Sequence, residues 1–278
     1  MAKRKQPVQE DPVIHDLSDF VEFNITKVLY DGTKRKRATL YLVKVRAAAT
    51  SHRGRKATRK SAAPSARESG LYVLKIFPES VANQDDYKRE LATNVVLGRS
   101  FALPDAQSAC DTMTVASGDF PASRWPRCFG TLRTRKDPTP GTWIRRDANS
   151  DHNSALLFEY IPDLELLTRE LVTEELSQEY KQVLADLHAL QILHRDQILY
   201  AAWPEIVFNN LFLRPNKITG KKEIMILDFD KSLVLGNSAR DKMLLRNEAQ
   251  EMAEALDTAL SKKDMLQSLP KEVKRLLK

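Results

Sequence analysis

The stretch ILHRDQILYAAWPEIVFNNLFLR, residues 192–214, joins a long amphipathic segment to the first of two apolar strands. It contains the tripeptide His194-Arg195-Asp196, which is of the kind that presents a catalytic aspartate from a loop. An asparagine that opens a strand is expected five residues after such an aspartate, but Ala201 stands there. The asparagine best suited to this role is Asn210, 14 residues after Asp196. The loop therefore carries an insertion, uses a different base or has lost its chemistry.

The composition is typical of a globular protein. The chain has 278 residues, of which 42% are hydrophobic and 29% are charged. Its two cysteines form no CxxC pair, which argues against a disulfide framework or a structural zinc site and suits a reducing compartment. No apolar run is long enough to cross a bilayer, and the N-terminus shows no apolar signal segment. We therefore expect an intracellular protein, cytoplasmic or nuclear, with no membrane partner.

Positive charge is concentrated in the first 60 residues. They hold 15 Lys and Arg against 6 Asp and Glu, whereas the whole chain has a net charge of +7, so the remainder is slightly acidic. The basic clusters are residues 3–5, 34–37 and 51–60. Such clusters are typical of segments that bind nucleic acid, acidic partners or an import receptor, and equally of solvated tails and loop tips.

The pattern of apolar residues predicts both strands and helices. Two β-like runs around the turn signal Asp31-Gly32 predict a hairpin over residues 20–46. The clearest helix is 173–191, because its apolar residues recur on one face. A second helix is expected at 80–100 with Asn83 as its N-cap. Further strands are expected at 70–77, 127–135, 155–163, 210–214 and 222–230, and helical structure at 247–278 with a break at Pro270.

The order of these elements predicts an α+β fold of two segregated lobes. Strands and one helix occupy residues 20–161, and mostly helices follow over 162–278. The polar stretches near 47–69 and 100–124 predict flexible insertions within the first lobe, and residues 1–19 predict a basic, flexible N-terminus.

Two charged residues stand out in the first lobe. Lys75 shares a strand face with Val73 and Phe77, and a lysine on an apolar face is costly unless it is paired. The simpler explanation is an edge-strand lysine that reaches water. Glu90 lies at the border of the apolar face of the next helix, from which it could pair with Lys75, although a surface glutamate in helix pairs is the simpler explanation.

Three further residues stand out in the second lobe. Asp196 follows the C-terminal end of a long helix, Asn210 opens a short strand after Asn209, and Asp228 ends the apolar run IMIL. An asparagine and an aspartate at adjacent strand ends offer oxygen ligands for Mg²⁺, which also keeps waters and substrate phosphates. Turn formation is the simpler explanation for each residue taken alone.

Taken in chain order, these features resemble the protein-kinase-like superfamily. The order is a lysine in a strand, a glutamate in the next helix, HRD after a long helix, an asparagine before a strand and D-F-x after the next strand. The resemblance covers about residues 20–260. It implies a two-lobed protein-kinase-like fold, with a β-rich N-lobe, a hinge and a small helical C-lobe.

The resemblance implies a role for each residue. Lys75 would hold the α- and β-phosphates of ATP and pair with Glu90. Asp196 would accept the proton of the acceptor hydroxyl, and Asn210 and Asp228 would bind Mg²⁺. The adenine-facing hinge would consist of Phe158, Glu159, Tyr160 and Ile161.

The sequence also departs from the kinase pattern. Residues 30–38, YDGTKRKRA, hold one glycine where a glycine-rich loop is expected. D-F-G is replaced by D-F-D, so that Asp230 stands at the glycine position. No A-P-E motif follows, and only 48 residues come after Asp230, too few for a full helical lobe with an activation segment. The second lobe is closer to those of small atypical kinases and aminoglycoside-phosphotransferase-like enzymes.

Two carboxylates compete for the role of base. Glu205 lies five residues before Asn210, at the spacing that Asp196 lacks. In one interpretation residues 197–205 are an insertion and Asp196 still reaches the site. In the other, Glu205 takes the base position, since its chemistry as a proton acceptor is similar. His194 and Arg195 beside Asp196 favour the first.

Three functions are consistent with the sequence. The first is transfer of the γ-phosphoryl group of Mg-ATP to a hydroxyl, with protein Ser/Thr as the default acceptor and a small molecule as another. The second is a pseudokinase scaffold, which the missing glycine loop and D-F-D favour. The third is nucleic-acid binding through the basic N-terminal region, which predicts strongly salt-dependent affinity.

Overall fold

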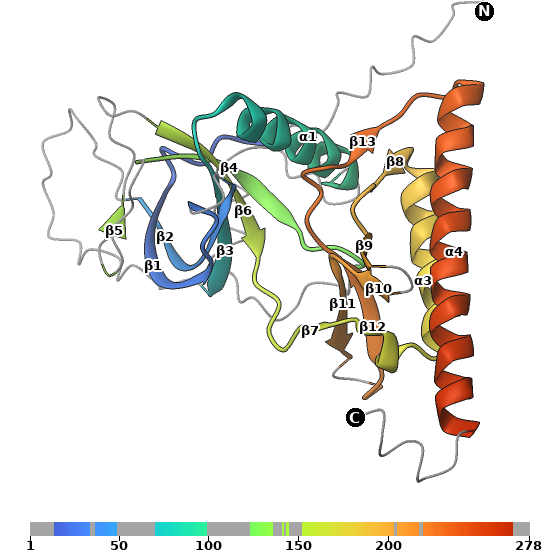
Figure 1. The fold of residues 1–278 in the computed structure, drawn as a ribbon. Coiled ribbons are helices and arrows are strands. Elements are labelled where there is room, and N and C mark those ends of the chain that lie inside the picture. Colours follow the sequence, from blue (N-terminus) through green and yellow to red (C-terminus); the bar gives the residue numbers. More distant parts are fainter. Residues whose placement is uncertain are drawn as a thin grey trace, which may run out of the picture. The chain divides into compact units, whose positions relative to one another are not determined.

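The computed structural model describes residues 14–33, 37–48, 70–98, 123–135, 141, 143–144, 152–202, 205–216 and 219–268. The fold is α+β, as predicted, with a curled antiparallel sheet and three α-helices in these ranges (Figure 1). Several predictions fall outside the described residues: the basic clusters at 3–5 and 51–60, most of both flexible insertions and the break at Pro270.

The chain divides into two compact units. Unit 1 comprises Met1–Tyr87, Asn94–Phe120 and Arg127–Tyr160. Unit 2 comprises Lys88–Thr93, Pro121–Pro126 and Ile161–Lys278. The chain thus passes between the units several times, and a short piece of the first helix is grouped with unit 2.

Unit 1 is built on a six-stranded sheet in which every pair is antiparallel. The strand order is β4-β6-β3-β2-β1-β5. The expected hairpin is confirmed as β1 paired with β2. The strands are β1 (Val21–Tyr30), β2 (Thr39–Ala47), β3 (Leu71–Phe77), β4 (Cys128–Arg135), β5 (Trp143–Ile144) and β6 (His152–Glu159).

Alternating side chains of the sheet form the core of unit 1. In β1, Val21, Phe23 and Ile25 are buried and the residues between them are half-buried, but everything after Ile25 is exposed. The far half of the hairpin therefore extends beyond the core. Its tip is tight, because a Cβ on Gly32 would lie 2.1 Å from the Ala38 carbonyl oxygen.

Residues 14–19 also belong to this unit, although the sequence predicts a flexible N-terminus over 1–19. The Leu17 amide donates to the Thr131 carbonyl, and the Thr131 amide donates to the His15 carbonyl, both at 2.9 Å. Leu17 is fully buried and lies against Gly130, where a Cβ would approach the Leu17 side chain to 2.5 Å. The reason for the difference is that Leu17 fills a site that the missing side chain of Gly130 leaves open.

Helix α1 (Val81–Leu97) begins one residue after the predicted start at 80. Its N-cap is Ser80, whose hydroxyl accepts from the Asn83 amide, so the prediction of Asn83 as N-cap is wrong. Amides in the first turn of a helix have no acceptor within the helix, and a serine at the N-cap supplies one. Asn83 contributes instead as a donor, since its Nδ2 lies 2.6 Å from the Ser80 hydroxyl.

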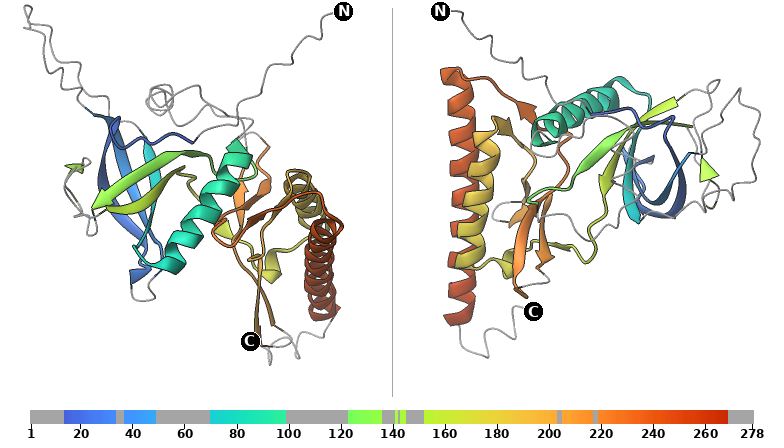
Figure 2. Two further views of the ribbon diagram at one scale, coloured as in Figure 1. Left: turned by 90° about the horizontal axis from the view of Figure 1, so that it is seen from above. Right: turned by 180° about the vertical axis from the view of Figure 1, so that it is seen from behind.

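Unit 2 contains two long helices side by side, α3 (Glu174–Ala189) and α4 (Ala239–Ser268) (Figures 1 and 2). The predicted helix at 173–191 is confirmed, and its N-cap is Thr173. Helix α4 starts eight residues before the predicted 247. Ser238 and Asp241 cap each other reciprocally: the Asp241 amide donates to the Ser238 hydroxyl, and the Ser238 amide donates to the Asp241 carboxylate.

Unit 2 is richer in strands than the expected small helical lobe. The described residues form a three-stranded sheet, β12-β11-β7, and two strand pairs, β9 with β10 and β8 with β13. A 3-10 helix, η3 (Arg169–Leu171), precedes α3. The strands are β7 (Glu165–Leu166), β8 (Ile192–Leu193), β9 (Ile198–Ala202), β10 (Glu205–Phe208), β11 (Leu211–Pro215), β12 (Lys222–Ile226) and β13 (Leu233–Val234).

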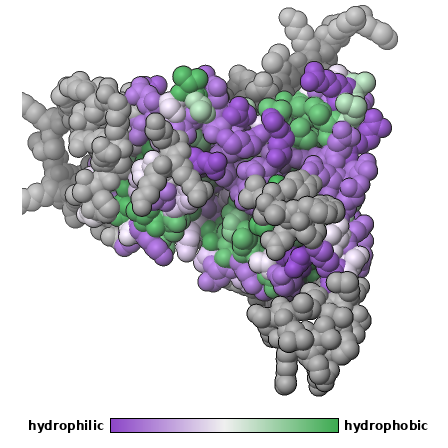
Figure 3. Space-filling model, in the orientation of Figure 1, coloured by the Kyte–Doolittle hydropathy of each residue, from purple (hydrophilic) through white to green (hydrophobic). Residues whose placement is uncertain are grey.

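The face of the molecule in Figure 3 is mostly hydrophilic, with several separate hydrophobic patches. Within the described ranges, no helix combines the length and the apolar character needed to cross a membrane.

Candidate functional site

The stretch 192–214 folds as a loop followed by a β-hairpin. After α3 the chain forms the two-residue strand β8, turns through His194-Arg195-Asp196 and enters β9. β9 and β10 pair antiparallel, with Ile198 opposite Phe208 at the base of the hairpin. The Asn209 amide donates to the Gln197 carbonyl at 2.8 Å and extends this pairing by one step. Residues 198–208, which separate Asp196 from Asn210 in the sequence, therefore form a hairpin whose two ends lie next to each other.

This closure places Asn210 beside Asp196. The Nδ2 of Asn210 donates to the Asp196 carbonyl oxygen at 3.0 Å and to its carboxylate oxygen Oδ2 at 3.2 Å. The Asn209 side chain also approaches the Asp196 carbonyl, at 3.4 Å. Because Nδ2 of Asn210 is committed to Asp196, the amide oxygen Oδ1 is the atom that remains suited to a cation.

His194 links the loop to the segment that precedes Asp228. It is fully buried, and its ring lies edge-on to Phe229, with 5.0 Å between centroids. Its Nε2 lies 3.0 Å from the Leu227 carbonyl oxygen, which can only accept, so the proton is on Nε2. Nδ1 then accepts from the Asp196 amide at 3.4 Å. A neutral imidazole thus connects Asp196 to the residue before Asp228.

Burial lowers the pKa of His194 below its ordinary value. The hydrogen bond to the Leu227 carbonyl and the nearby carboxylates of Glu248, Asp228 and Asp196 oppose this effect but do not reverse it. The neutral form that both hydrogen bonds require is therefore the form that the site favours.

Glu248 on α4 fixes the backbone of the same loop. Its Oε1 accepts from the Arg195 amide at 2.7 Å, and its Oε2 lies 2.7 Å from Nε2 of His188 on α3. Glu248 is 9% exposed, so these bonds lie largely out of water. On the other side of Asp196, the buried Tyr180 hydroxyl donates to the side-chain oxygen of Gln197. Helices α3 and α4 therefore hold the residues immediately before and after Asp196.

Burial raises the pKa of Tyr180 well above its ordinary value, and the negative charge of Glu248 adds to this effect. The hydroxyl therefore keeps its proton and remains a donor to Gln197.

Asp228 lies in the turn that follows β12, next to Asn210. The Leu227 amide donates to the Asn210 carbonyl at 2.9 Å. Two residues later, the Arg89 side chain donates to the Asp230 carbonyl at 3.0 Å. The Ser232 hydroxyl donates to the His194 carbonyl, and β13 then pairs with β8, with Leu233 opposite Leu193. The D-F-D segment is thus bonded on both sides to the loop that holds Asp196.

Left-handed backbone is concentrated at this place. Five described residues other than glycine have positive φ, and three of them are Arg195 (71°), Asn210 (57°) and Asp228 (59°). Asparagine and aspartate tolerate this conformation better than other residues, but an arginine adopts it at a cost. Such backbone persists where the surrounding bonds impose it, and it is frequent at functional sites.

The predicted nucleotide-binding residues lie elsewhere in the chain. Lys75 is in β3, 5% exposed, with its Nζ 5.2 Å from the centroid of the Phe77 ring, and Glu90 is in α1, 2% exposed. Lys75 belongs to unit 1 and Glu90 to unit 2. Of the predicted hinge, Phe158 and Glu159 end β6, opposite Val73 and Tyr72 of β3, and Tyr160 and Ile161 follow it.

The backbone pairing of β10 shows where Glu205, the second candidate base, lies. Glu205 is the first residue of β10 and pairs with Ala202 near the far end of the hairpin. Asn210 lies beyond the base of the hairpin, where Phe208 meets Ile198. The hairpin therefore separates Glu205 from Asn210 along a strand, whereas it brings Asp196 and Asn210 together.

Asn210 and Asp228 could hold a magnesium ion. Among the described residues no group of three or more His, Cys, Asp and Glu side chains is gathered to hold a metal. Mg²⁺ does not need such a cage, since it is commonly bound by one or two carboxylates together with waters and substrate phosphates. Asp228 and the Oδ1 of Asn210 offer this kind of donor set.

Three residues of this arrangement were missed from the sequence: His188, Tyr180 and Glu248. Glu248 had a usable signal, because it interrupts the buried stripe that Leu245 and Met252 continue on α4. A carboxylate within an apolar stripe requires a partner. The partners lie 53 and 60 positions away, and no local pattern identifies them.

Neither a scan against models of protein families nor a search of curated proteins finds a match to this chain.

Proposed function

We propose that this protein is a phosphotransferase of the protein-kinase-like type, which moves the γ-phosphoryl group of Mg-ATP to a hydroxyl. The observation that carries the proposal is the hydrogen bond from Asn210 to the Asp196 carboxylate across a hairpin, beside Asp228. An aspartate, an asparagine and a second aspartate are the groups that phosphoryl transfer of the kinase type uses. The buried His194 bonds the Asp196 amide and the carbonyl of Leu227, the residue before Asp228.

In this proposal Asp196 orients the acceptor hydroxyl and takes its proton. Its carboxylate is directed by Asn210, and its backbone is fixed by His194. The fixed position matters because phosphoryl transfer depends mainly on positioning and on neutralising charge, with little covalent chemistry from the protein. Asp196 is preferred to Glu205 because it is the carboxylate bonded to Asn210.

Mg-ATP supplies the phosphoryl group, and the ion neutralises charge on the phosphate oxygens. Asn210 and Asp228 would hold the ion, and Lys75 would hold the phosphates. The adenine would lie against the segment Phe158, Glu159, Tyr160 and Ile161.

The same proposal extends to the fold. Unit 1, with its antiparallel sheet, would be the N-lobe of a two-lobed kinase fold, and unit 2, with α3 and α4, would be a reduced C-lobe. The β8–β13 pair and the reciprocal bonds between the HRD and D-F-D segments support this assignment.

Nucleotide binding is the first test. Mg-ATP binds only the folded state, so it must raise the unfolding temperature of the wild type, by an amount that grows with ATP concentration. ATP without Mg²⁺ should give a smaller shift, and Lys75→Met should lose most of it. If Mg-ATP leaves the unfolding temperature of the wild type unchanged, the proposed phosphotransferase function is excluded.

A pseudokinase scaffold is the second candidate, and one observation favours it. The amide of Gly32, the only glycine of the first hairpin, donates to the Thr39 hydroxyl at 3.3 Å. That amide is therefore engaged within the hairpin, whereas glycine-rich loops direct their amides at phosphates. A folded protein that binds partners but neither Mg-ATP nor an acceptor would support the scaffold.

A further inference from the structure

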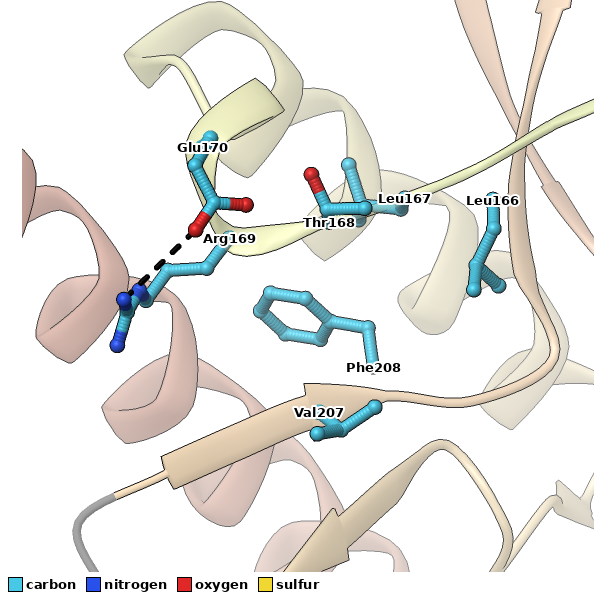
Figure 4. A pocket seen from close by; sticks show the side chains of 7 residues that line it. All are labelled: Leu166, Leu167, Thr168, Arg169, Glu170, Val207 and Phe208. Carbon is cyan, nitrogen blue, oxygen red and sulfur yellow. Dashed lines mark ion pairs between the residues drawn. The ribbon is translucent and has the colours of Figure 1, made fainter. Parts of the chain in front are cut away.

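A pocket of about 270 Å³ lies in unit 2 between two segments of the chain (Figure 4). One wall is the segment from β7 through η3, and the other is the end of β10. The Phe208 ring lies in the middle of the lining side chains, with Leu166 on one side and Arg169 on the other (Figure 4). The lining residues are Leu166, Leu167, Thr168, Arg169, Glu170, Val207 and Phe208.

The pocket is attached to the candidate catalytic loop. Phe208 precedes Asn210 by two residues, a length of chain that spans at most ~7 Å. On the opposite wall, the Leu167 amide donates to the Leu211 carbonyl at 2.9 Å. Both walls are thus anchored to the residues on either side of Asn210, so the pocket keeps a fixed position relative to Asp196 and Asn210 within unit 2.

The buried part of the pocket lining is apolar. The charged residues of the lining form an ion pair with each other. Leu167 and Phe208 are 1% and 2% exposed, and they form the buried part. Arg169 pairs with Glu170 at 3.7 Å. The neighbouring Glu165 is paired with Lys222. These charges already compensate one another, so the pocket suits an uncharged, apolar group.

The rim of the pocket is also apolar. Leu166 is 42% exposed and Val207 is 41% exposed, so two large hydrophobic side chains flank the opening. Exposed apolar residues gathered around a cavity are typical of a binding surface. The volume lies below the 300–1,000 Å³ of pockets for drug-sized ligands, and it suits one branched aliphatic or aromatic side chain.

We infer that this pocket binds one apolar side chain of a protein acceptor, close in sequence to the hydroxyl that Asp196 serves. The inference rests on the proposed phosphotransferase function. Phe208 is linked to Asn210 by a length of chain of at most ~7 Å, so an extended peptide would place the bound side chain a few residues from the hydroxyl. Val207 and Phe208 of β10 supply one wall of the pocket, so the β9–β10 hairpin would contribute directly to binding this side chain.

The test is a positional-scanning peptide library with a fixed serine or threonine, phosphorylated with Mg-ATP. At one position near the serine or threonine, the wild type should prefer Leu, Ile or Phe over Asp by about 10-fold or more, since burial of such a side chain favours binding by that factor. Leu166→Asp and Val207→Asp should each reduce this ratio several-fold toward 1. Met243→Asp is the matched control, because Met243 is 48% exposed on α4 and outside the pocket lining; it should keep the ratio.

Both pocket residues are partly exposed, so the variants should fold, and thermal unfolding of each variant checks this. A wild-type enzyme without an apolar preference overturns the inference, as does a preference that both folded variants retain. Transfer to small alcohols but not to peptides overturns it as well, while the proposed function stands. Failure of the wild type to bind Mg-ATP and to phosphorylate any acceptor is the distinct result that overturns the proposed function, and the inference with it.

Discussion

Asn210 donates from one side-chain nitrogen to both the carbonyl and the carboxylate oxygen of Asp196, a residue 14 positions earlier. The two bonds hold the carboxylate relative to its own backbone, so the side chain has little freedom to turn away. The backbone is in turn fixed by His194 and Glu248. This degree of constraint is what a group needs when its contribution is to orient a reactant.

The first prediction concerns the base. We expect Asp196→Asn to lower kcat for phosphoryl transfer by about 10²–10⁴-fold, because an amide cannot accept the proton. Glu205→Gln should change kcat by less than a few-fold, since Glu205 lies along the hairpin from Asn210. Steady-state kinetics with a peptide acceptor measure both values. Full activity of Asp196→Asn would contradict the assignment.

The second prediction concerns the anchor of the loop. Glu248→Ala removes the acceptor of the Arg195 amide and the partner of His188, and it should cost roughly 2–4 kcal/mol of unfolding free energy. If the proposed function holds, it should also lower kcat with little change in the KM for ATP, because it displaces Asp196 and leaves the residues proposed to hold the nucleotide intact. Denaturant unfolding and kinetics give the two readouts.

Two variants on the same helix serve as controls for this anchor. Glu248→Gln should retain most of both properties, since its amide oxygen can still accept from the Arg195 amide and its side chain keeps a polar group beside His188. Asp257→Asn removes an exposed carboxylate whose ion pair with Lys181 spans 3.8 Å, and such pairs contribute little. If Glu248→Ala loses stability but keeps kcat, Glu248 supports the fold and does not position the loop.

The third prediction concerns pH. The pKa of His194 is lowered in the folded protein, so below about pH 6.5 the unfolded chain binds a proton that the folded protein resists. The free energy of unfolding should therefore fall as the pH drops below about 6.5, down to the lowered pKa of the folded state. Denaturant unfolding at pH 7.5, 6.5 and 5.5 measures this, and His194→Asn should have a flatter profile over the same range. An equally steep profile in the variant would assign the effect to other groups.

The fourth prediction concerns the packing of the N-terminal segment on the sheet of unit 1. Gly130→Ala would place a Cβ 2.5 Å from the Leu17 side chain and 2.7 Å from the His15 carbonyl oxygen, so one of them must move. We expect a loss of about 1–3 kcal/mol in the free energy of unfolding. Gly98→Ala is the matched control, because a Cβ there meets nothing within 4 Å. Equal unfolding temperatures for the two variants would show that residues 14–17 adapt without cost.

The sequence predicts the parts of the fold that depend on local patterns. The β1–β2 hairpin follows from alternation around Asp31-Gly32, and α3 follows from its apolar stripe after Thr173. The sequence predicts helical structure only from 247, whereas α4 begins at Ala239. Its start is defined by the reciprocal cap of Ser238 and Asp241. The N-cap of α1 was assigned to Asn83 although Ser80 holds it, since both residue types cap helices and only the backbone geometry decides.

The sequence predicts which residues belong to the candidate site, but it does not predict how they lie relative to one another. Asp196, Asn210 and Asp228 were selected by their order in the chain, and the order says nothing of whether a hairpin folds between the first two. That depends on residues 198–208 pairing with one another, which the sequence did not reveal because β9 and β10 are short and their pairing has a register shift. The supports His188 and Glu248 belong to different helices, and their contact depends on how α3 and α4 pack.

The antiparallel pairing at Ile198 and Phe208 has a consequence for how such a loop can vary. In an antiparallel pair the two ends of the inserted chain stay adjacent whatever its length, so residues can be added or removed at the far end in facing pairs without moving Asp196 away from Asn210. The distance in sequence between these two residues is therefore no measure of whether the loop is intact. A pattern with a fixed interval between aspartate and asparagine would overlook such chains, whereas one that permits a strand–turn–strand of any length between them would recognise them.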